Sequence, residues 1–255
     1  RVGGLEPGKT YRYRIMQQAV LSDEGNKRVV LGEGYGSDIL KHAPYPVTTP
    51  SADRNELEFW MVNDIHGRDS VFRLLIGDAP RQKPDFVCLN GDLLNSIESE
   101  KALFEGFLAS ASELLTPAGI PLVVTRGNHD GRGKFARHWL DYFPTPTGES
   151  YYTFRRGPVF FVVLDGCEDK PDSDIRYYGL STADAYREQQ AQWLRGVVAG
   201  EEFRSAPYRI VLIHMPPNKG RGWHGELEIE RLFLPILDGS GIDLMLCGHY
   251  HRYQW

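Results

Sequence analysis

The sequence contains little cysteine and no long apolar run. Three cysteines stand among 255 residues, too few for the disulfide framework of a small secreted domain. Cys88 and Cys247 lie within short apolar runs, so we expect them to be buried thiols. No apolar run approaches the roughly 18 residues that a membrane-spanning helix requires. The sequence therefore predicts a globular chain without a transmembrane segment.

An excess of basic residues is also lacking. Lysine and arginine together number 29 against 34 acidic residues, which gives a formal net charge of −5. Such a chain has no overall positive field for a nucleic-acid backbone, which weighs against nucleic acid as a partner. Hydrophobic residues at 41% and charged residues at 25% are ordinary for a folded chain with a sizeable core. The composition does not indicate an oligomeric state.

What the sequence does contain is a series of five polar clusters, each directly after a short apolar run. The clusters are Asp64-Ile65-His66, Gly91-Asp92, Gly127-Asn128-His129-Asp130, the single His214 and Gly248-His249-Tyr250-His251. Short apolar runs of this kind predict buried strands. The carboxyl ends of parallel strands meet at one edge of a sheet, where open α/β proteins bind their ligands. We therefore expect the five clusters to form a single site.

The side chains in these clusters suit a pair of metal ions. Two cations about 4 Å apart need carboxylate oxygens, imidazole nitrogens and one carboxylate that can bridge. Any one cluster is common by chance, and Gly-Asp after a strand is often only a turn. The order of the clusters and their donor types together favour a two-metal hydrolytic site.

The same clusters resemble the motifs of the calcineurin-like metallophosphoesterase superfamily, over roughly residues 56–255. Stretches between the motifs, such as Gln192-Trp193-Leu194, are similar to those of its purple-acid-phosphatase-like branch. The resemblance implies an α/β fold built as a four-layer αββα sandwich. The expected strands are 57–63, 85–90, 120–126, 151–156, 158–165, 208–214 and 242–247, and the expected helices are 70–77, 98–115, 133–141, 184–199 and 226–238.

The resemblance also implies which residues hold the two ions. Asp92 would be shared, and the other ligands divide into Asp64, His66 and His251 for one ion and Asn128, His214 and His249 for the other. A bridging carboxylate offsets the repulsion between two cations, and the neutral amide of Asn128 keeps both ions strongly Lewis acidic. Donors of this kind suit divalent or trivalent manganese, iron, zinc or cobalt.

The activity that the resemblance implies is hydrolysis of a phosphate ester, monoester or diester, by a metal-bridging hydroxide. His129 is expected beside the phosphate, where it would protonate the leaving group, and Asp130 is expected to orient it. His224 is a second candidate acid ten residues after His214, although a histidine in a glycine-rich loop is as often only solvated.

The substrate would be a small-molecule phosphate ester, whose identity depends on loops that the sequence does not resolve. The expected substrate contacts are Asn128, His129, Asn95 and Arg68. Arg68 and Arg132 follow metal clusters and are suited to phosphate oxygens, but ordinary loop arginines occupy such positions as well. A catalytically silent scaffold or binding module with this fold is the alternative function. Scaffolds usually lose metal ligands, whereas this sequence retains the full set.

One position departs from the patterns of the superfamily. Purple acid phosphatases have tyrosine three residues after the Gly-Asp aspartate, and phosphoprotein phosphatases have aspartate there. This chain has Asn95, which provides neither a tyrosinate ligand nor a charged partner for His129. We therefore predict a colourless protein without a tyrosinate charge-transfer band.

The amino-terminal segment predicts a different module. Residues 4–15 combine a Pro-Gly turn with alternation that places Tyr11 and Tyr13 on one face of a strand. This pattern resembles the tyrosine corner of fibronectin type III modules. We expect residues 1–52 to be part of such a module with a proline-rich linker, and residues 53–255 to be the phosphoesterase domain, truncated at its carboxyl end. Such modules favour an extracytoplasmic location, secreted or periplasmic.

Overall fold

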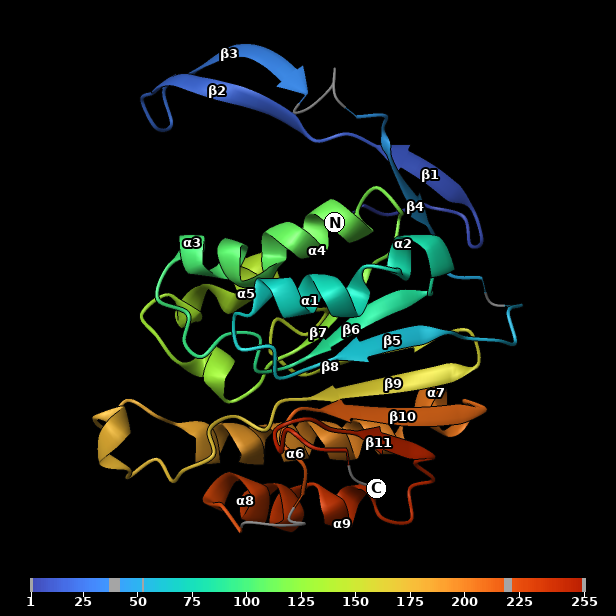
Figure 1. Ribbon diagram of the computed structural model, residues 1–255, viewed down its shortest axis with the longest axis vertical. Helices are drawn as coiled ribbons and strands as arrows, with labels where there is room; N and C mark the ends of the chain where they lie inside the picture. The colour runs from blue at the N-terminus through green and yellow to red at the C-terminus, as the bar shows by residue number, and fades with distance from the viewer. Residues whose placement is uncertain (1, 37–41, 52, 218–221, 254–255) are drawn as a thin grey trace.

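The computed structural model describes residues 2–36, 42–51, 53–217 and 222–253. Two sheets face each other in the larger part of the molecule (Figure 1). The first contains the parallel strands β5 (Phe59–Val62), β6 (Phe86–Asn90) and β7 (Leu122–Thr125). The second has the order β11-β10-β9-β8, with β8 (Tyr152–Arg156), β9 (Val159–Leu164), β10 (Tyr208–Ile213) and β11 (Leu244–Leu246). Only the β8–β9 pair in it is antiparallel.

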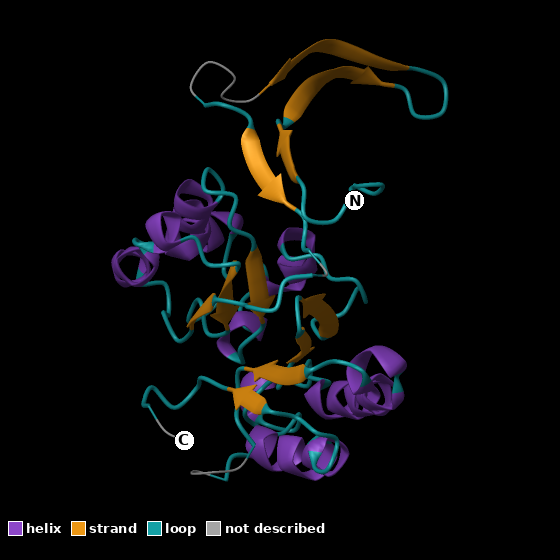
Figure 2. Cartoon of the chain, turned by 90° about the vertical axis from the view of Figure 1, so that its right-hand side faces the viewer, coloured by secondary structure: helices purple, strands orange, loops and turns teal. Residues whose placement is uncertain are grey.

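Helices cover the outer face of each sheet. The first sheet is covered by α1 (Asp69–Ile76), α2 (Ala79–Gln82), α3 (Glu100–Leu103), α4 (Ala109–Leu115) and α5 (Trp139–Tyr142). The second is covered by α6 (Ala183–Ala199), α7 (Glu201–Arg204), α8 (His224–Leu232) and α9 (Leu234–Leu237). Figures 1 and 2 show the resulting helix, sheet, sheet, helix order. The predicted four-layer α/β sandwich is confirmed.

Side chains on the central strands alternate between two apolar layers. On β6, Phe86 and Cys88 point between the sheets, whereas Val87 and Leu89 pack beneath the helices of the first sheet. On β9, Phe161 and Val163 face the first sheet. Both strands are buried along their whole length. This is why the sequence shows continuous apolar runs there instead of alternation.

Three predicted helices depart from a single regular α-helix in the structure. The helix expected at 98–115 is continuous but contains a π-helical segment, η1 (Phe104–Leu108), between α3 and α4. The helix expected at 226–238 is divided into α8 and α9 at Phe233. Pro235 explains the division, because proline has no amide hydrogen and clashes with the preceding turn of a helix. The helix expected at 133–141 is a 3-10 turn, Ala136–His138, followed by the short helix α5. The remaining expected elements are present within a few residues of their predicted bounds.

The amino-terminal segment forms two separate strand pairs. The strands β1 (Thr10–Tyr13) and β4 (Tyr45–Thr48) pair antiparallel, as do β2 (Met16–Asp23) and β3 (Val29–Gly36). These pairs lie beyond the helices of the first sheet (Figure 1). The Tyr11 hydroxyl accepts a hydrogen bond of 2.9 Å from the Glu6 amide. The fibronectin-like assignment and the domain boundary at residue 52 stay predictions. None of the helices in the described residues could span a membrane.

Candidate metal centre

The five polar clusters meet at the carboxyl-terminal edge of the two sheets. They follow β5, β6, β7, β10 and β11, and backbone hydrogen bonds continue the strand pairing into the loops. The amides of Asp64 and His66 donate to the carbonyls of Gly91 and Asp92, at 3.0 Å each. The Gly248 amide donates to the His214 carbonyl at 2.8 Å. Loops that are far apart in sequence are therefore held side by side.

One group of candidate ligands lies on the solvent side of the centre. The Nε2 atom of His251 lies 3.1 Å from Nε2 of His66 and 3.2 Å from Oδ1 of Asp64. His66 Nε2 is also 3.9 Å from Oδ2 of Asp92. The ligand atoms of Asp64, His66 and His251 all lie within 4.8 Å of one another.

A second group lies deeper and shares Asp92. His214 Nε2 is 3.2 Å from Oδ2 of Asp92 and 3.8 Å from Oδ1 of Asp64. The ligand atoms of Asp92, His214 and His249 lie within 4.8 Å of one another. Asn128, on the loop after β7, is buried with 2% of its surface exposed. It lines one hollow together with His66, Asp92, His249 and His251, so all seven residues predicted as ligands lie around one centre.

Several buried atoms in this centre lack a hydrogen-bonding partner. They are Asp64 Oδ1, His66 Nδ1, Asn128 Oδ1, His214 Nε2 and His249 Nε2. Buried polar atoms are normally satisfied, so a cluster of exceptions calls for a bound group. The Nδ1 atom of His214 is 2.7 Å from the carbonyl oxygen of Asn90, and donation there leaves the Nε2 lone pair for a ligand role. A cation therefore fits this donor set.

The charges in the deeper group also favour a cation. Burial disfavours a charged His214, but the neighbouring carboxylates of Asp92 and Asp64 outweigh it and raise the pKa of His214 to about 9. Burial acts against the ionised form of Asp92 too, and His214 nevertheless holds the pKa of Asp92 well below its usual range. Burial and the proximity of His214 lower the pKa of His249 to about 4. A metal would take over the charge that the His214 proton supplies, and its binding releases that proton.

The backbone at these ligands is strained. Of the eight non-glycine residues with positive φ in the described residues, five are candidate ligands: Asp64 (56°), His66 (48°), Asp92 (52°), His249 (76°) and His251 (51°). Such conformations cost of order 1–3 kcal/mol each and persist only where the surrounding structure imposes them. The strain is concentrated where side chains must converge.

The glycines of three clusters are required by close packing. A Cβ at Gly127 would lie 2.2 Å from the Asp92 nitrogen and 2.3 Å from its Oδ1. At Gly91 it would lie 2.6 Å from the His214 ring, and at Gly248 it would lie 2.7 Å from Oδ2 of Asp64. Each glycine therefore lets a neighbouring loop bring its ligand into place.

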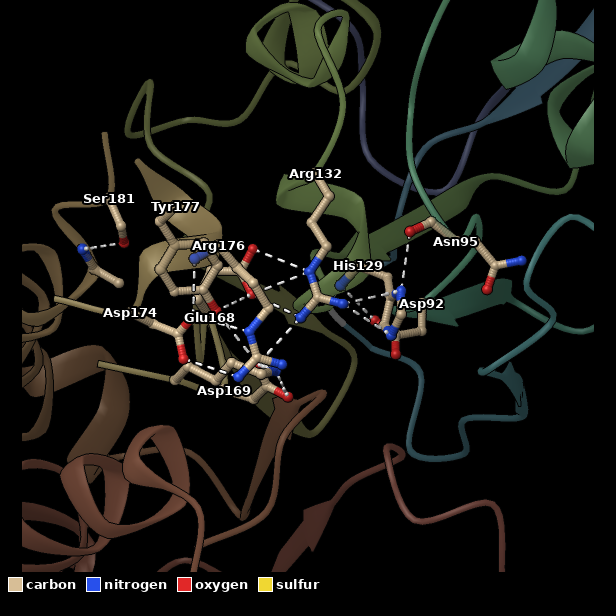
Figure 3. A network of polar contacts seen from close by, with 12 residues as sticks. Asp92, Asn95, His129, Arg132, Glu168, Asp169, Asp174, Arg176, Tyr177 and Ser181 are labelled. Atoms are coloured by element: carbon tan, nitrogen blue, oxygen red, sulfur yellow. Dashed lines mark hydrogen bonds and ion pairs between the residues drawn. The ribbon is translucent and has the colours of Figure 1, made fainter. Parts of the chain in front are cut away.

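His129 borders the metal centre, but its partners differ from those predicted. Its amide donates to Asp92 Oδ1 at 2.9 Å, and its ring Nδ1 lies 2.9 Å from the backbone oxygen of Asn95. The Asn95 side chain points away from the ring (Figure 3). The expected substrate contact through the Asn95 side chain does not fit this geometry, because the carbonyl of this residue, not its amide, faces the site.

The predicted role of Asp130 as the partner of His129 is also wrong. The Asp130 carboxylate is fully buried and accepts hydrogen bonds from the amides of Leu93, Leu94 and Gly127, at 3.0, 3.2 and 2.9 Å. It joins the loop after β6 to the loop after β7. Asp130 therefore fixes the distance between Asp92 and Asn128 and is not available for proton transfer.

Two further predicted residues lie outside the centre. Arg68 donates to the carbonyls of Ile65 and Asp64, so it stabilises the loop after β5 and does not face the substrate. His224 is 2.7 Å from Oδ1 of Asp184. It lines a neighbouring hollow together with Trp223 and Asp169, which both also line the hollow at the metal centre.

The hollow over the candidate ligands has a volume of about 300 Å³. Its walls are His66, Asp92, Asn128, His129, Asp169, Trp223, His249, Tyr250 and His251. Sequence reasoning missed Asp169 and the buried Glu226, which accepts a hydrogen bond of 2.6 Å from the Tyr250 hydroxyl. Neither residue belongs to a short motif, so only the tertiary structure places them near the centre.

Two of the curated proteins that are similar to this chain are named as phosphatases. A serine/threonine-protein phosphatase, CPPED1 of Pongo abelii, is 25% identical over 178 residues, which cover 67% of this chain and 54% of that protein. Purple acid phosphatase 22 of Arabidopsis thaliana is 23% identical over 277 residues, covering 100% of this chain and 52% of that protein. The chain thus spans about half the length of these curated relatives.

Solved structures show the same fold. The purple acid phosphatase PPD1 of yellow lupin (Lupinus luteus) has a TM-score of 0.60 at 14% identity, over 98% of this chain and 46% of that one. A dimetal phosphatase of Danio rerio has a TM-score of 0.53 at 15% identity, over 76% and 82%. A family model described as calcineurin-like phosphoesterase matches residues 57–253. With that match spanning both sheets and all five polar clusters, the chain belongs to the calcineurin-like phosphoesterase family.

Proposed function

We propose that the chain is a dinuclear metal-dependent hydrolase of phosphate esters. The observation that carries this proposal is the convergence of six histidine and aspartate ligands into groups that meet at Asp92, with Asn128 in the wall of the same hollow. Buried lone pairs without partners in both groups support two cations. Asp64, His66 and His251 would hold one ion, Asn128, His214 and His249 the other, and Asp92 would bridge them.

The two ions would supply a nucleophilic hydroxide near neutral pH and neutralise charge on the phosphoryl oxygens. The residues of the chain provide the remaining requirements. Asn128 contributes a neutral oxygen, so the centre keeps a net positive charge for the anionic ester. His129 lines the hollow with its Nδ1 anchored on the Asn95 carbonyl, and its Nε2 would hydrogen-bond the phosphate or protonate the departing oxygen.

The catalytically silent scaffold is the second candidate function. It requires that the centre hold no metals or hold them without activity. The retained ligand set and the strained backbone at five ligands weigh against it, because strain of this kind is associated with functional sites. Manganese, iron, zinc and cobalt all suit the donors, so each should be tested.

Metal content and turnover decide between the two functions. Purified protein loaded with each metal is assayed by elemental analysis and with an aryl phosphomonoester, an aryl phosphodiester and a phosphoserine peptide. We expect two equivalents of metal per chain and turnover of at least one ester. Asp92→Asn should lose both, whereas Asp78→Asn, at an exposed carboxylate paired with Arg81, should keep both. A protein that binds no metal and hydrolyses none of the esters would support the scaffold.

Absorption of visible light tests the nature of the centre further. Asn95 occupies the position of the purple acid phosphatase tyrosine, and its side chain points away from the His129 ring (Figure 3). We therefore expect the iron-loaded protein to show no tyrosinate charge-transfer band. A purple protein would mean that another tyrosine, such as Tyr250 in the wall of the hollow, binds iron.

The location of the protein and the class of its substrate are also part of the proposal. An extracytoplasmic location is inferred from the fibronectin-like resemblance of residues 1–52. The substrate is inferred to be a small phosphate ester and not nucleic acid, because the net charge is −5.

A further inference from the structure

We propose that Arg132, itself held by carboxylates on the loop after β9, is a positioning residue that keeps the His129 imidazole in place. The expected effect of Arg132 on turnover rests on the proposed function, whereas its expected effect on the position of the His129 ring does not. Arg132 follows the Gly127-Asn128-His129-Asp130 cluster by two residues, and its side chain extends from His129 to the loop after β9 (Figure 3).

The contact between Arg132 and His129 is made over the ring. Nη1 of Arg132 lies 3.3 Å from Nδ1 and 3.2 Å from Nε2 of His129. A donor in the plane of the imidazole cannot be this close to both nitrogens, because it would collide with the carbon between them. Nη1 therefore lies over the ring face while Nε and Nη2 of the same guanidinium reach the carboxylates, an arrangement that the single ammonium of lysine does not reproduce.

The other side of the guanidinium is fixed by two carboxylates. Nε of Arg132 lies 3.2 Å from each Glu168 oxygen, and Nη2 lies 2.8 Å from Glu168 Oε2 and 3.1 Å from Asp169 Oδ1. The Tyr177 hydroxyl donates to Glu168 Oε2 at 2.9 Å. Two carboxylates and a tyrosine therefore restrict Arg132 to one orientation.

These contacts join the two sheets at the opening of the site. His129 and Arg132 follow β7 of the first sheet, whereas Glu168 and Asp169 follow β9 of the second. Asp169 itself lines the hollow, where an uncompensated carboxylate would repel a phosphate ester. Arg132 and Lys170, whose Nζ is 2.6 Å from Asp169 Oδ1, offset that charge.

The geometry separates positioning from direct substrate binding. Arg132 is not among the residues that line the hollow, and its Nε and Nη2 donors are used by the carboxylates. The Nδ1 of His129 is held by Asn95, so the Asn95 carbonyl fixes the ring edge and Arg132 fixes its face. Together they replace the carboxylate partner that Asn95 does not provide.

Turnover of two aryl phosphates with different leaving groups tests the catalytic consequence. In Arg132→Ala we expect kcat for phenyl phosphate to fall about 10- to 100-fold, which is the loss of rate expected when a catalytic group is displaced. KM should change little. The loss should be smaller for p-nitrophenyl phosphate, whose leaving group needs less protonation. Arg132→Lys should behave like Arg132→Ala, because one ammonium cannot contact the ring and both carboxylates in the way the guanidinium does. Added guanidinium at millimolar concentration should restore part of the activity of Arg132→Ala.

Two comparisons separate this role from simple loop stability. Arg176→Ala removes an arginine from the same region that pairs with Asp174 at 65% side-chain exposure, and it should leave kcat unchanged. In a His129→Ala background, Arg132→Ala should cost almost nothing more, because the two residues act as one unit. Equal and additive losses for both substrates would overturn the proposal.

NMR of the metal-free protein gives a readout that does not depend on activity. We expect the His129 ring signals to be those of one fixed ring in the wild type and in Arg176→Ala, and to shift and average in Arg132→Ala. Unchanged His129 signals in Arg132→Ala would overturn the positioning role, whatever the kinetics show. Changed signals in a metal-loaded protein that hydrolyses no ester would support the positioning role and contradict the proposed function.

Discussion

The two halves of the candidate metal centre have the same kinds of ligand but very different contact with solvent. The His251 side chain is 54% exposed and His66 is 12% exposed, whereas His214 and His249 are 1% and 4% exposed. In the described part of the chain, β5 and β11 are edge strands and β10 is an inner strand. Edge position alone does not separate the halves, because the buried His249 and the exposed His251 both follow β11. A water can replace a missing donor in the outer half, and much less easily in the inner half.

The largest expected effect comes from the glycine on which both halves depend. Gly127→Ala would place a methyl group 2.2 Å from the Asp92 nitrogen, which forces the shared carboxylate out of position. We expect loss of both metals, at least about a 100-fold loss of turnover and destabilisation by about 1–3 kcal/mol. Gly131→Ala in the same loop is the control, since a Cβ there has nothing within 4 Å. Equal behaviour of the two variants, measured by metal analysis and thermal unfolding, would contradict the close approach of Gly127 to Asp92.

The comparison of the halves itself is tested by removing one imidazole from each. His214→Ala should lower the affinity for one metal about 100-fold, whereas His251→Ala should lower it by only about tenfold. The reason is that water can take the place of the exposed ligand. Competition with a chromophoric chelator measures both constants, and a larger loss in His251→Ala would reverse the proposed asymmetry.

Asp130 provides a smaller effect that is independent of metal. Asp130→Asn replaces an oxygen that accepts backbone hydrogen bonds with a group that donates, so at least one buried amide loses its partner. We expect the free energy of unfolding of the metal-free protein to fall by about 2 kcal/mol. Urea denaturation measures it, with Asp78→Asn as an exposed control. A change equal to that of the control would mean that Asp130 does not join the two loops.

The smallest effect is expected at Arg68. Its guanidinium donates to backbone carbonyls after β5 and does not line the hollow. Arg68→Ala should therefore leave KM and kcat within about twofold of the wild type, as for most surface substitutions. A KM raised tenfold would support the contact between Arg68 and the substrate that the sequence predicted.

The sequence predicted the metal centre better than it predicted the surroundings of His129. The candidate ligands follow strands, and the run of apolar residues before each one identifies the strand and its carboxyl end. Asp130 looked like a partner of His129 because the two are adjacent in sequence. In the structure the carboxylate points to Leu93, Leu94 and Gly127. Adjacent residues in a tight turn point in different directions, and sequence spacing does not show which way.

The sequence by itself determined the order of strands and helices, the ligand types and the glycines that keep the clusters close. These features are local, since each depends on the apolar pattern and on the small set of residues that bind metals or fit a crowded turn. Only the tertiary structure decided that the Asn95 backbone, not its side chain, holds His129, and that Arg132 reaches Glu168 across the sheets. Such contacts depend on how two sheets pack face to face, and no short stretch of sequence encodes that arrangement.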